Sequence, residues 1–441
     1  MKLLRVQLIN LYETFNHDIG LNQDERITIL TAPNGYGKTI ALKTIYSLFN
    51  NKFTFFTKLV FDKIIFTFDN NDTLEIIKKE KRIELILKEN NKKPISFIYP
   101  SKEVEKEIRH NIPSHIIEDF TPPFIRRVGA DRWLNELSGE RLVTEEILEQ
   151  YNDMFPEHIL ERINGKIPKE LSRFLKVMTV YFIQEQRLIL RQPISEHRIR
   201  REVIITDTIE KYSNEFSHMI GELDKEYGQI TQSLDNSFPK RLFGENSDIS
   251  TSDELKNKLK NLEKKRQKIS EYGLLKVDDD SSFIVDENIN ESEKKALSLY
   301  IADNETKLSI FDTLMPKIEL FTQILNERRF NFKFIKIDKE RGFIFKTTKG
   351  DILELTDLSS GEQHEVVLLF ELLFKAKENS LVLIDEPEIS LHVVWQKAFL
   401  KDIEEIIKLQ KIDIVIATHS PFIIDDRWDL TVNLEESEIV K

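Results

Sequence analysis

The stretch of sequence that decides the fold is residues 32–39, which read Ala32-Pro33-Asn34-Gly35-Tyr36-Gly37-Lys38-Thr39. The apolar run at residues 26–30 before it predicts a strand, and the apolar spacing of residues 40–49 predicts a helix after it. A glycine-rich turn that ends in Lys-Thr between a strand and a helix is typical of a phosphate-binding loop, although Ala32 stands where the usual pattern has its first glycine. The sequence therefore predicts an α/β protein that holds a phosphate group at this turn.

Each residue type in the loop has a chemical reason to be there. Gly35 and Gly37 allow backbone N–H groups to face phosphate oxygens, and Lys38 supplies a positive charge for the β- and γ-phosphates. The hydroxyl of Thr39 is a ligand for Mg²⁺. We therefore expect ATP and Mg²⁺ as cofactors, with the nucleotide bound by Asn34, Gly35, Tyr36, Gly37, Lys38, Thr39 and Ile40.

A second chemical centre follows two apolar runs near the other end of the chain. Asp385 and Glu386 come directly after the apolar residues 381–384, and His419 follows the apolar residues 413–417. An aspartate at such a strand end holds Mg²⁺ through water, and the neighbouring glutamate can polarise a water for attack on the γ-phosphate. We expect Glu386 and His419 to be catalytic, with His419 donating to the γ-phosphate, and Thr39 and Asp385 to hold the metal.

A third motif, Ser359-Ser360-Gly361-Glu362, precedes a predicted helix at residues 361–376. Taken alone, it reads equally well as a helix N-cap. Its hydroxyl and N–H groups also suit a phosphate, which would duplicate the role of Lys38. The duplication disappears if the turn contacts the ATP held by a neighbouring subunit. We therefore expect a homodimer or higher oligomer with ATP at its interfaces.

Together these motifs resemble the ABC-type ATPases of the SMC, RecF and OLD group, strongly over roughly the first 50 and the last 110 residues. The resemblance implies that Glu386 is the general base and that Ser359 and Gly361 contact ATP in trans. It also implies that Ser390-Leu391-His392 crosses the dimer interface, and that Gln184 or Gln186 links the metal to the helical insertion. Glu362 stands where transporter subunits usually have glutamine, a form more similar to SMC-type heads.

Within that group the C-terminal block resembles compact bacterial defence ATPases, those of PARIS-type systems (AriA-like) and, less closely, those of Septu and retron systems. This resemblance implies an ATPase that senses phage infection, through a phage-encoded trigger, and controls a separate effector such as a nuclease. Only about twenty residues follow His419, so we expect no nuclease domain of the OLD type in this chain. The alternative is a RecF- or SMC-like ATPase that binds DNA.

Composition limits these alternatives. The 441 residues include no cysteine, carry a net charge of −12 and contain no membrane-spanning run or signal peptide, which predicts a cytoplasmic protein that does not bind membranes. A cationic stretch, residues 187–201, is the candidate contact for DNA, RNA or an acidic protein, or else a solvated helix face.

The order of the predicted elements suggests three parts. Residues 1–100 would form the first half of the ATPase head, with the phosphate loop and a β-meander. Residues 101–330, rich in charged helical patterns, would form an inserted helical lid. Within it, residues 209–234 and 254–269 would form a helical pair, and residues 293–329 a returning helix broken near Pro316. Residues 331–441 would complete the head with βαβ order.

Overall fold

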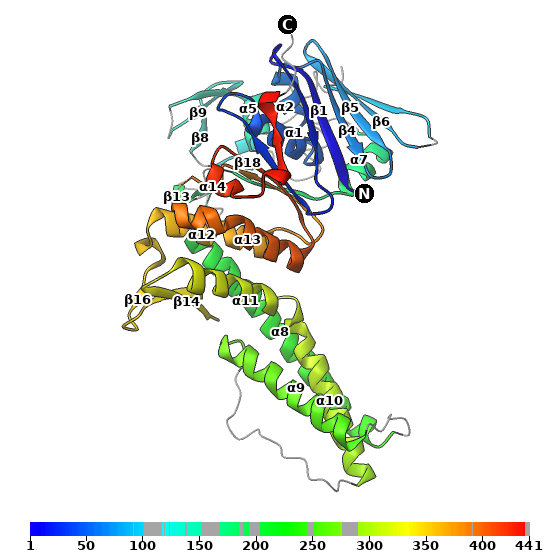
Figure 1. Cartoon of the computed structure of the whole chain (residues 1–441), viewed down its shortest axis with the longest axis vertical. Coiled ribbons are helices and arrows are strands. Elements are labelled where there is room, and N and C mark those ends of the chain that lie inside the picture. Colours follow the sequence, from blue (N-terminus) through cyan, green and yellow to red (C-terminus); the bar gives the residue numbers. More distant parts are fainter. Residues whose placement is uncertain are drawn as a thin grey trace. The chain divides into compact units, whose positions relative to one another are not determined.

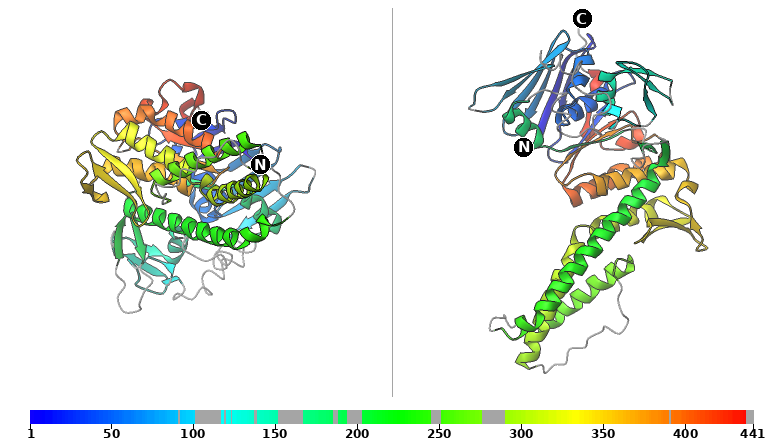
Figure 2. Two further views of the ribbon diagram at one scale, coloured as in Figure 1. Left: turned by 90° about the horizontal axis from the view of Figure 1, so that it is seen from below. Right: turned by 180° about the vertical axis from the view of Figure 1, so that it is seen from behind.

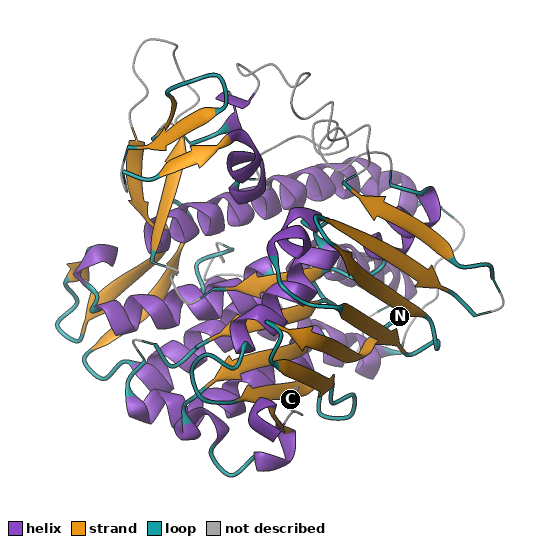
Figure 3. Cartoon of the chain, turned by 90° about the horizontal axis from the view of Figure 1, so that it is seen from above, coloured by secondary structure: helices purple, strands orange, loops and turns teal. Residues whose placement is uncertain are grey.

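The computed structural model describes residues 1–90, 92–100, 117–118, 120–122, 124–136, 139–151, 167–184, 188–193, 203–244, 251–275, 290–389 and 391–436, drawn in colour in Figure 3. The chain forms two compact units. The first contains residues 1–206 and 371–441, and the second contains residues 207–370. No helix in the described part of the chain is both long enough and apolar enough to cross a membrane.

The first unit contains a six-stranded antiparallel sheet in the order β2-β1-β4-β5-β6-β7 (Figure 1). Its strands alternate between buried and more exposed residues, so one face supplies apolar side chains to the core. The bounds are β1 Leu3–Leu11, β2 Phe15–Gly20, β4 Lys63–Phe68, β5 Thr73–Lys79, β6 Arg82–Lys88 and β7 Ile95–Tyr99.

The same unit contains a five-stranded parallel sheet in the order β11-β17-β18-β3-β19. β17 is buried along its whole length, as a parallel sheet covered on both faces requires. In register, Asp385 lies opposite Ala417, and Thr418 opposite Thr31, so the carboxyl ends of three strands meet at one edge. The bounds are β3 Ile27–Thr31, β11 Val180–Ile183, β17 Leu381–Asp385, β18 Asp413–Thr418 and β19 Thr431–Asn433.

Helix α1 (Lys38–Phe49) joins the two sheets into one core. It packs against the parallel strands β11, β17 and β18. At its end, the ring of Phe49 makes edge contacts with Phe66 and Phe68 of the antiparallel sheet. The remaining helices of this unit are α2 Phe53–Lys58, α5 Thr144–Gln150, α7 Lys169–Lys176, the π-helix η5 Glu371–Lys375, α13 Val393–Gln410, α14 Pro421–Ile424, and the 3-10 turns η6 Trp428–Leu430 and η7 Leu434–Glu436.

Residues 101–206 differ from the helical lid that the sequence predicts. Their described part contains mainly short strands, and it clusters with the first unit. One group, β8 to β10, forms a small sheet whose core is built on the fully buried Trp133. Because charged residues flank these short strands, their alternating pattern is weak in the sequence. The strands are β8 Ile125–Arg127, β9 Arg132–Asn135, β10 Arg141–Val143, β12 Ile189–Pro193 and β13 Val203–Asp207.

The second unit combines long helices with a three-stranded sheet in the order β14-β15-β16. Phe343 of β15 contacts Phe216 of α8 and Phe370 of α12, so the sheet shares a core with the helices. For this reason residues 331–370, predicted as part of the head's C-terminal half, belong to the same unit as the helices. The elements are α8 Thr208–Leu242, α9 Ser252–Glu271, α10 Glu291–Ser309, η2 Ile310–Asp312, α11 Met315–Gln323, the π-helix η3 Ile324–Arg329, β14 Lys333–Asp338, β15 Gly342–Thr347, β16 Ile352–Leu353, η4 Leu355–Asp357 and α12 Ser360–Phe370.

The helices of this unit also pair differently from the prediction. α10 packs against both α8 and α9 and lies beside them in Figures 1 and 2, whereas the sequence suggested α8 and α9 as the main pair. The returning helix ends at Ser309, and Pro316 occupies the first turn of α11, where its missing N–H group costs nothing.

Candidate functional site

The phosphate loop has the backbone shape that its glycines predict. Gly35 and Gly37 have φ values of 92° and 85°, a left-handed conformation that glycine adopts without strain. Gly37 is the N-cap of α1, and no side-chain hydrogen bond caps this end of the helix. A β-carbon at Gly37 would approach Leu11 Cδ2 to 3.3 Å. The turn therefore fits a phosphate group.

A histidine that the sequence analysis did not identify supports this loop from β2. His17 is buried, and its Nε2 donates a hydrogen bond to the carbonyl oxygen of Tyr36 at 2.9 Å. Phe15 stacks on the His17 ring and contacts the ring of Tyr36. Burial lowers the pKa of His17, which favours the neutral imidazole. The alternation along β2 places His17 on the same face as Ile19, which indicates a core position and not a functional site.

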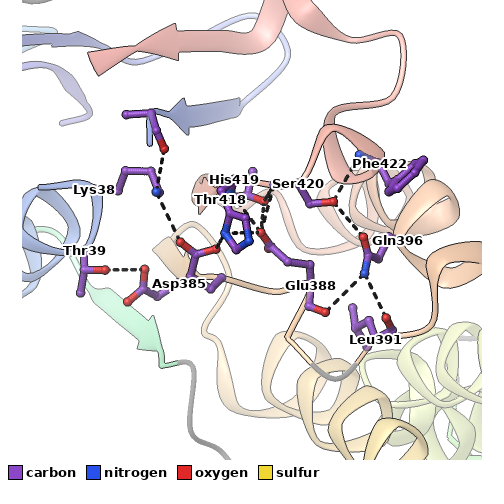
Figure 4. A network of polar contacts seen from close by, with 12 residues as sticks. Lys38, Thr39, Asp385, Glu388, Leu391, Gln396, Thr418, His419, Ser420 and Phe422 are labelled. Carbon is purple, nitrogen blue, oxygen red and sulfur yellow. Dashed lines mark hydrogen bonds and ion pairs between the residues drawn. The ribbon is translucent and has the colours of Figure 1, made fainter. Parts of the chain in front are cut away.

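Lys38 and Thr39 reach across to the end of β17 (Figure 4). Thr39 Oγ1 donates to Asp385 Oδ1 at 3.0 Å. The ammonium of Lys38 lies 2.9 Å from the carbonyl oxygen of Ala32 and 3.5 Å from Glu386 Oε1. Residues from the two ends of the chain therefore form one cluster. The hydroxyl of Thr39 and the carboxylate of Asp385 are oxygen donors of the kind that Mg²⁺ prefers.

The two predicted catalytic residues touch each other. His419 Nδ1 donates to Glu386 Oε2 at 2.6 Å, which leaves the Nε2 side of the ring available for a phosphate oxygen. Burial raises the pKa of Glu386, and the neighbouring carboxylate of Glu388 raises it further, while His419 and Lys38 offset part of this rise. The pKa of Glu386 is therefore closer to neutral pH than the pKa of an exposed glutamate, which suits a general base.

Glu388 is a second residue to which the sequence analysis assigned no role. Its buried Oε1 accepts three hydrogen bonds, from Thr418 Oγ1 at 2.6 Å, His419 N at 3.0 Å and Ser420 N at 3.1 Å. It thereby fixes the backbone that carries His419. Its place two residues after Glu386, in Asp385-Glu386-Pro387-Glu388, was the only signal.

Gln396 of α13 connects the loop that carries Glu388 to Ser420. Its Nε2 donates to the carbonyl oxygens of Glu388 and Leu391, and its Oε1 accepts from Ser420 Oγ at 2.8 Å. Carboxylate and ring atoms of Glu386, Glu388 and His419 also lie within 4.8 Å of one another, a spacing that a metal ion accepts. The hydrogen bonds that join His419 to Glu386 and Glu388 already explain why these atoms lie close together.

The signature turn belongs to the second unit and forms a helix cap. Ser359 N and Oγ donate to Glu362 Oε2 at 2.9 and 2.8 Å, and Ser359 Oγ accepts from Glu362 N. Ser360 and Gly361 open α12, and Lys333 of β14 donates to Glu362 at 2.9 Å. Burial alone would raise the pKa of Glu362, but the bonds from Lys333 and Ser359 outweigh it and lower the pKa. Glu362 is therefore an ionised cap residue.

The remaining predicted site residues are placed only in part. Gln184 directly follows β11, whose Ile183 pairs with Ile384, so Gln184 lies at the sheet edge next to Asp385. Its competitor Gln186 and the loop residue Ser390 lie outside the described residues, as does most of the cationic stretch 187–201. His392 caps α13, its Nδ1 accepting from Val394 N.

Comparison with known proteins identifies the family of the chain. The family model described as "AAA ATPase domain" matches residues 1–424, so the chain belongs to this family of ATPases and binds ATP. No curated protein matches the chain significantly.

Among solved structures, the chain is similar to three SMC head domains. The head from Pyrococcus furiosus, bound to the C-terminal domain of ScpA, has 11% identity, a TM-score of 0.35 and coverage of 99% of this chain and 95% of that one. A head bound to the C-winged helix domain of ScpA has 10% identity, a TM-score of 0.37 and coverage of 100% of this chain and 97% of that one. The head from Thermotoga maritima has 10% identity, a TM-score of 0.31 and coverage of 96% of this chain and 92% of that one.

Replacing Glu388 with alanine tests its positioning role. We expect kcat for ATP hydrolysis to fall by about a hundredfold with little change in KM, because His419 loses its fixed position while the phosphate loop is untouched. Steady-state ATPase kinetics measure this, with Asp426→Ala as an exposed-carboxylate control. A Glu388→Ala enzyme with a normal kcat would contradict the assignment.

The pKa of Glu386 predicts a pH dependence. The base must be ionised, so kcat/KM should fall on the acid side at a higher pH than an ordinary glutamate would give. Glu388→Gln removes a negative charge that raises this pKa, so the acid limb should move to lower pH. Asp351→Asn, the same charge change at an exposed site, should leave the limb in place. An unchanged limb in Glu388→Gln would show that another group titrates.

Proposed function

We propose that the chain is an ATP-driven switch whose ATP-bound form is an oligomer with nucleotide at the subunit interface. The observation that carries the proposal is the division of the motifs between the two units. Lys38, Thr39, Asp385, Glu386 and His419 assemble in the first unit, whereas the signature turn belongs to the second. A site of this class needs both sets, and a second copy of the chain supplies the missing one.

Within this proposal each residue has one task. The phosphate loop and Lys38 bind the phosphates. Thr39 and Asp385 would hold Mg²⁺, which would stabilise the negative charge that develops in the transition state. Glu386 accepts the proton of the attacking water, and His419 donates to the γ-phosphate from its Nε2 side. Gln184 reports the occupancy of the site through its place at the end of β11. Ser359 leaves its bond with Glu362 to contact the partner's nucleotide.

We further propose that this switch senses phage infection and controls a separate effector, an activity suited to the cytoplasm. The similarity of the C-terminal motifs to compact defence ATPases supports this role. Its ligands would be a phage-encoded trigger and an effector protein such as a nuclease. The alternative is a RecF- or SMC-like ATPase that uses the cationic stretch 187–201 to bind DNA.

Mixing two inactive variants tests the shared site. Lys38→Ala and Ser359→Arg should each abolish hydrolysis, because one lacks the phosphate contact and the other blocks the trans contact. An equal mixture should recover about a quarter of the wild-type rate, since half of the dimers are mixed and each has one intact site. ATPase assays before and after mixing measure this. No recovery, with both variants folded and able to associate, would contradict a trans signature.

Phage challenge tests the biological role. Cells that produce the chain together with the product of its neighbouring gene should resist at least one phage in a broad panel, and Lys38→Ala should remove the resistance. Plating efficiency measures the effect. Absence of resistance, together with ATP-dependent duplex binding that Arg198→Gln, Arg200→Gln and Arg201→Gln weaken, would favour the DNA-binding alternative instead.

A further inference from the structure

The outer face of the small sheet β14-β15-β16 carries aromatic side chains in water. Phe332 is 78% exposed and Phe334 is 38% exposed. Thr348 N donates to the carbonyl oxygen of Phe332, which extends the ladder beyond β14, so both rings lie on the same face two residues apart. On the neighbouring strands this face continues with Ile344 and with Ile352, which is 52% exposed.

Lysines alternate with these apolar groups on the same face. Lys346 pairs with Phe334 on one side and Ile352 on the other, and Lys336 pairs with Ile344. Among the described residues neither lysine has an ion-pair partner, whereas Lys333 binds Glu362 and Lys339 binds Asp224. The face is therefore positively charged within a chain of net charge −12. We call Phe332, Phe334, Lys336, Lys346 and Ile352 the sheet face.

The edges of the sheet do not invite a further strand. At β14, the Asn326 side chain accepts from Ile335 N at 2.7 Å and donates to Ile335 O at 3.2 Å, so it already occupies the outward-facing backbone groups in the middle of this strand. At the other edge, β16 has only two residues. An added peptide strand would find little backbone to pair with, so a ligand of this sheet would contact the side chains of its exposed face.

The acidic side chain at the end of β14 takes part in the hairpin turn. Asp338, at the end of β14, uses its Oδ1 to accept hydrogen bonds from Glu340 N and Arg341 N in the hairpin turn. Lys333 and Glu362 lie on the opposite side of β14, because adjacent residues of a strand point to opposite faces. The aromatic face is thus turned away from the signature turn.

We propose that the sheet face binds single-stranded nucleic acid. Two rings about 6.6 Å apart along a strand can each stack on one base, and flanking lysines can contact the phosphates. A duplex does not fit this role, because its bases are already stacked on one another. The ligand is defined by unpaired bases and phosphates, which RNA and DNA share.

Fluorescence anisotropy of the full-length chain tests the proposal, using labelled twelve-nucleotide oligo(U) and oligo(dT). Phe332→Ala/Phe334→Ala should weaken binding by about thirtyfold or more, since both stacking contacts are lost. Lys336→Gln/Lys346→Gln should weaken it too and reduce the slope of log affinity against log salt by about 1.4. Comparing the two oligonucleotides distinguishes RNA from DNA.

Matched controls separate the face from general surface effects. Phe243, 86% exposed in the same unit, is changed to alanine, and Lys258 and Lys260 of α9 are changed to glutamine. These variants should bind as the wild type does, and all variants should keep basal ATPase activity as proof of folding. Equal affinity of the wild type and Phe332→Ala/Phe334→Ala would overturn the proposal. So would equal competition by a duplex, or a loss of self-association in the aromatic variant, which would identify an interface between copies.

Discussion

The pairing of β3 with β18 is the constraint on which the site depends. It joins the two ends of the chain in one parallel sheet, and Arg26 donates to Asp413 at 2.7 Å where the two strands begin. Because parallel strands in register end at the same edge, the loops after β3, β17 and β18 converge there. Lys38, Glu386 and His419 meet for this reason alone, since no local structure connects them.

The sequence revealed the residues whose chemistry is required at a fixed spacing. Lys38 and Asp385 belong to this group, because a phosphate loop and an acidic strand end each tolerate few side-chain types. His17 and Glu388 could not be assigned, because each acts on groups that only the tertiary structure brings near it. Tyr36 follows a strand of the other sheet, and residues 418–420 lie at the end of the strand that pairs with β17. The strands around Trp133 were missed for a related reason: short strands in charged surroundings carry little periodic signal.

The second unit fixes its signature helix through a shared core. Phe370 of α12 contacts Phe216, Phe321 and Phe343. On the same helix, the buried Glu365 accepts from Arg329 Nε at 2.7 Å, a contact in which each charge depends on its partner. Sequence patterns located these helices but not their partners, because the contacts are made between segments far apart in the chain. The middle and the end of α12 are consequently held to the sheet and the helices of this unit.

Glu386 adopts a backbone angle that its side chain does not favour, with φ at 44°. Such a conformation costs a non-glycine residue on the order of 1–3 kcal/mol. Glycine would accept the turn at lower cost, but it would remove the carboxylate that faces Lys38 and His419. The chain thus gives up folding stability at the position of the proposed general base. The stability of the fold and the placement of this carboxylate therefore set opposite requirements on the same residue.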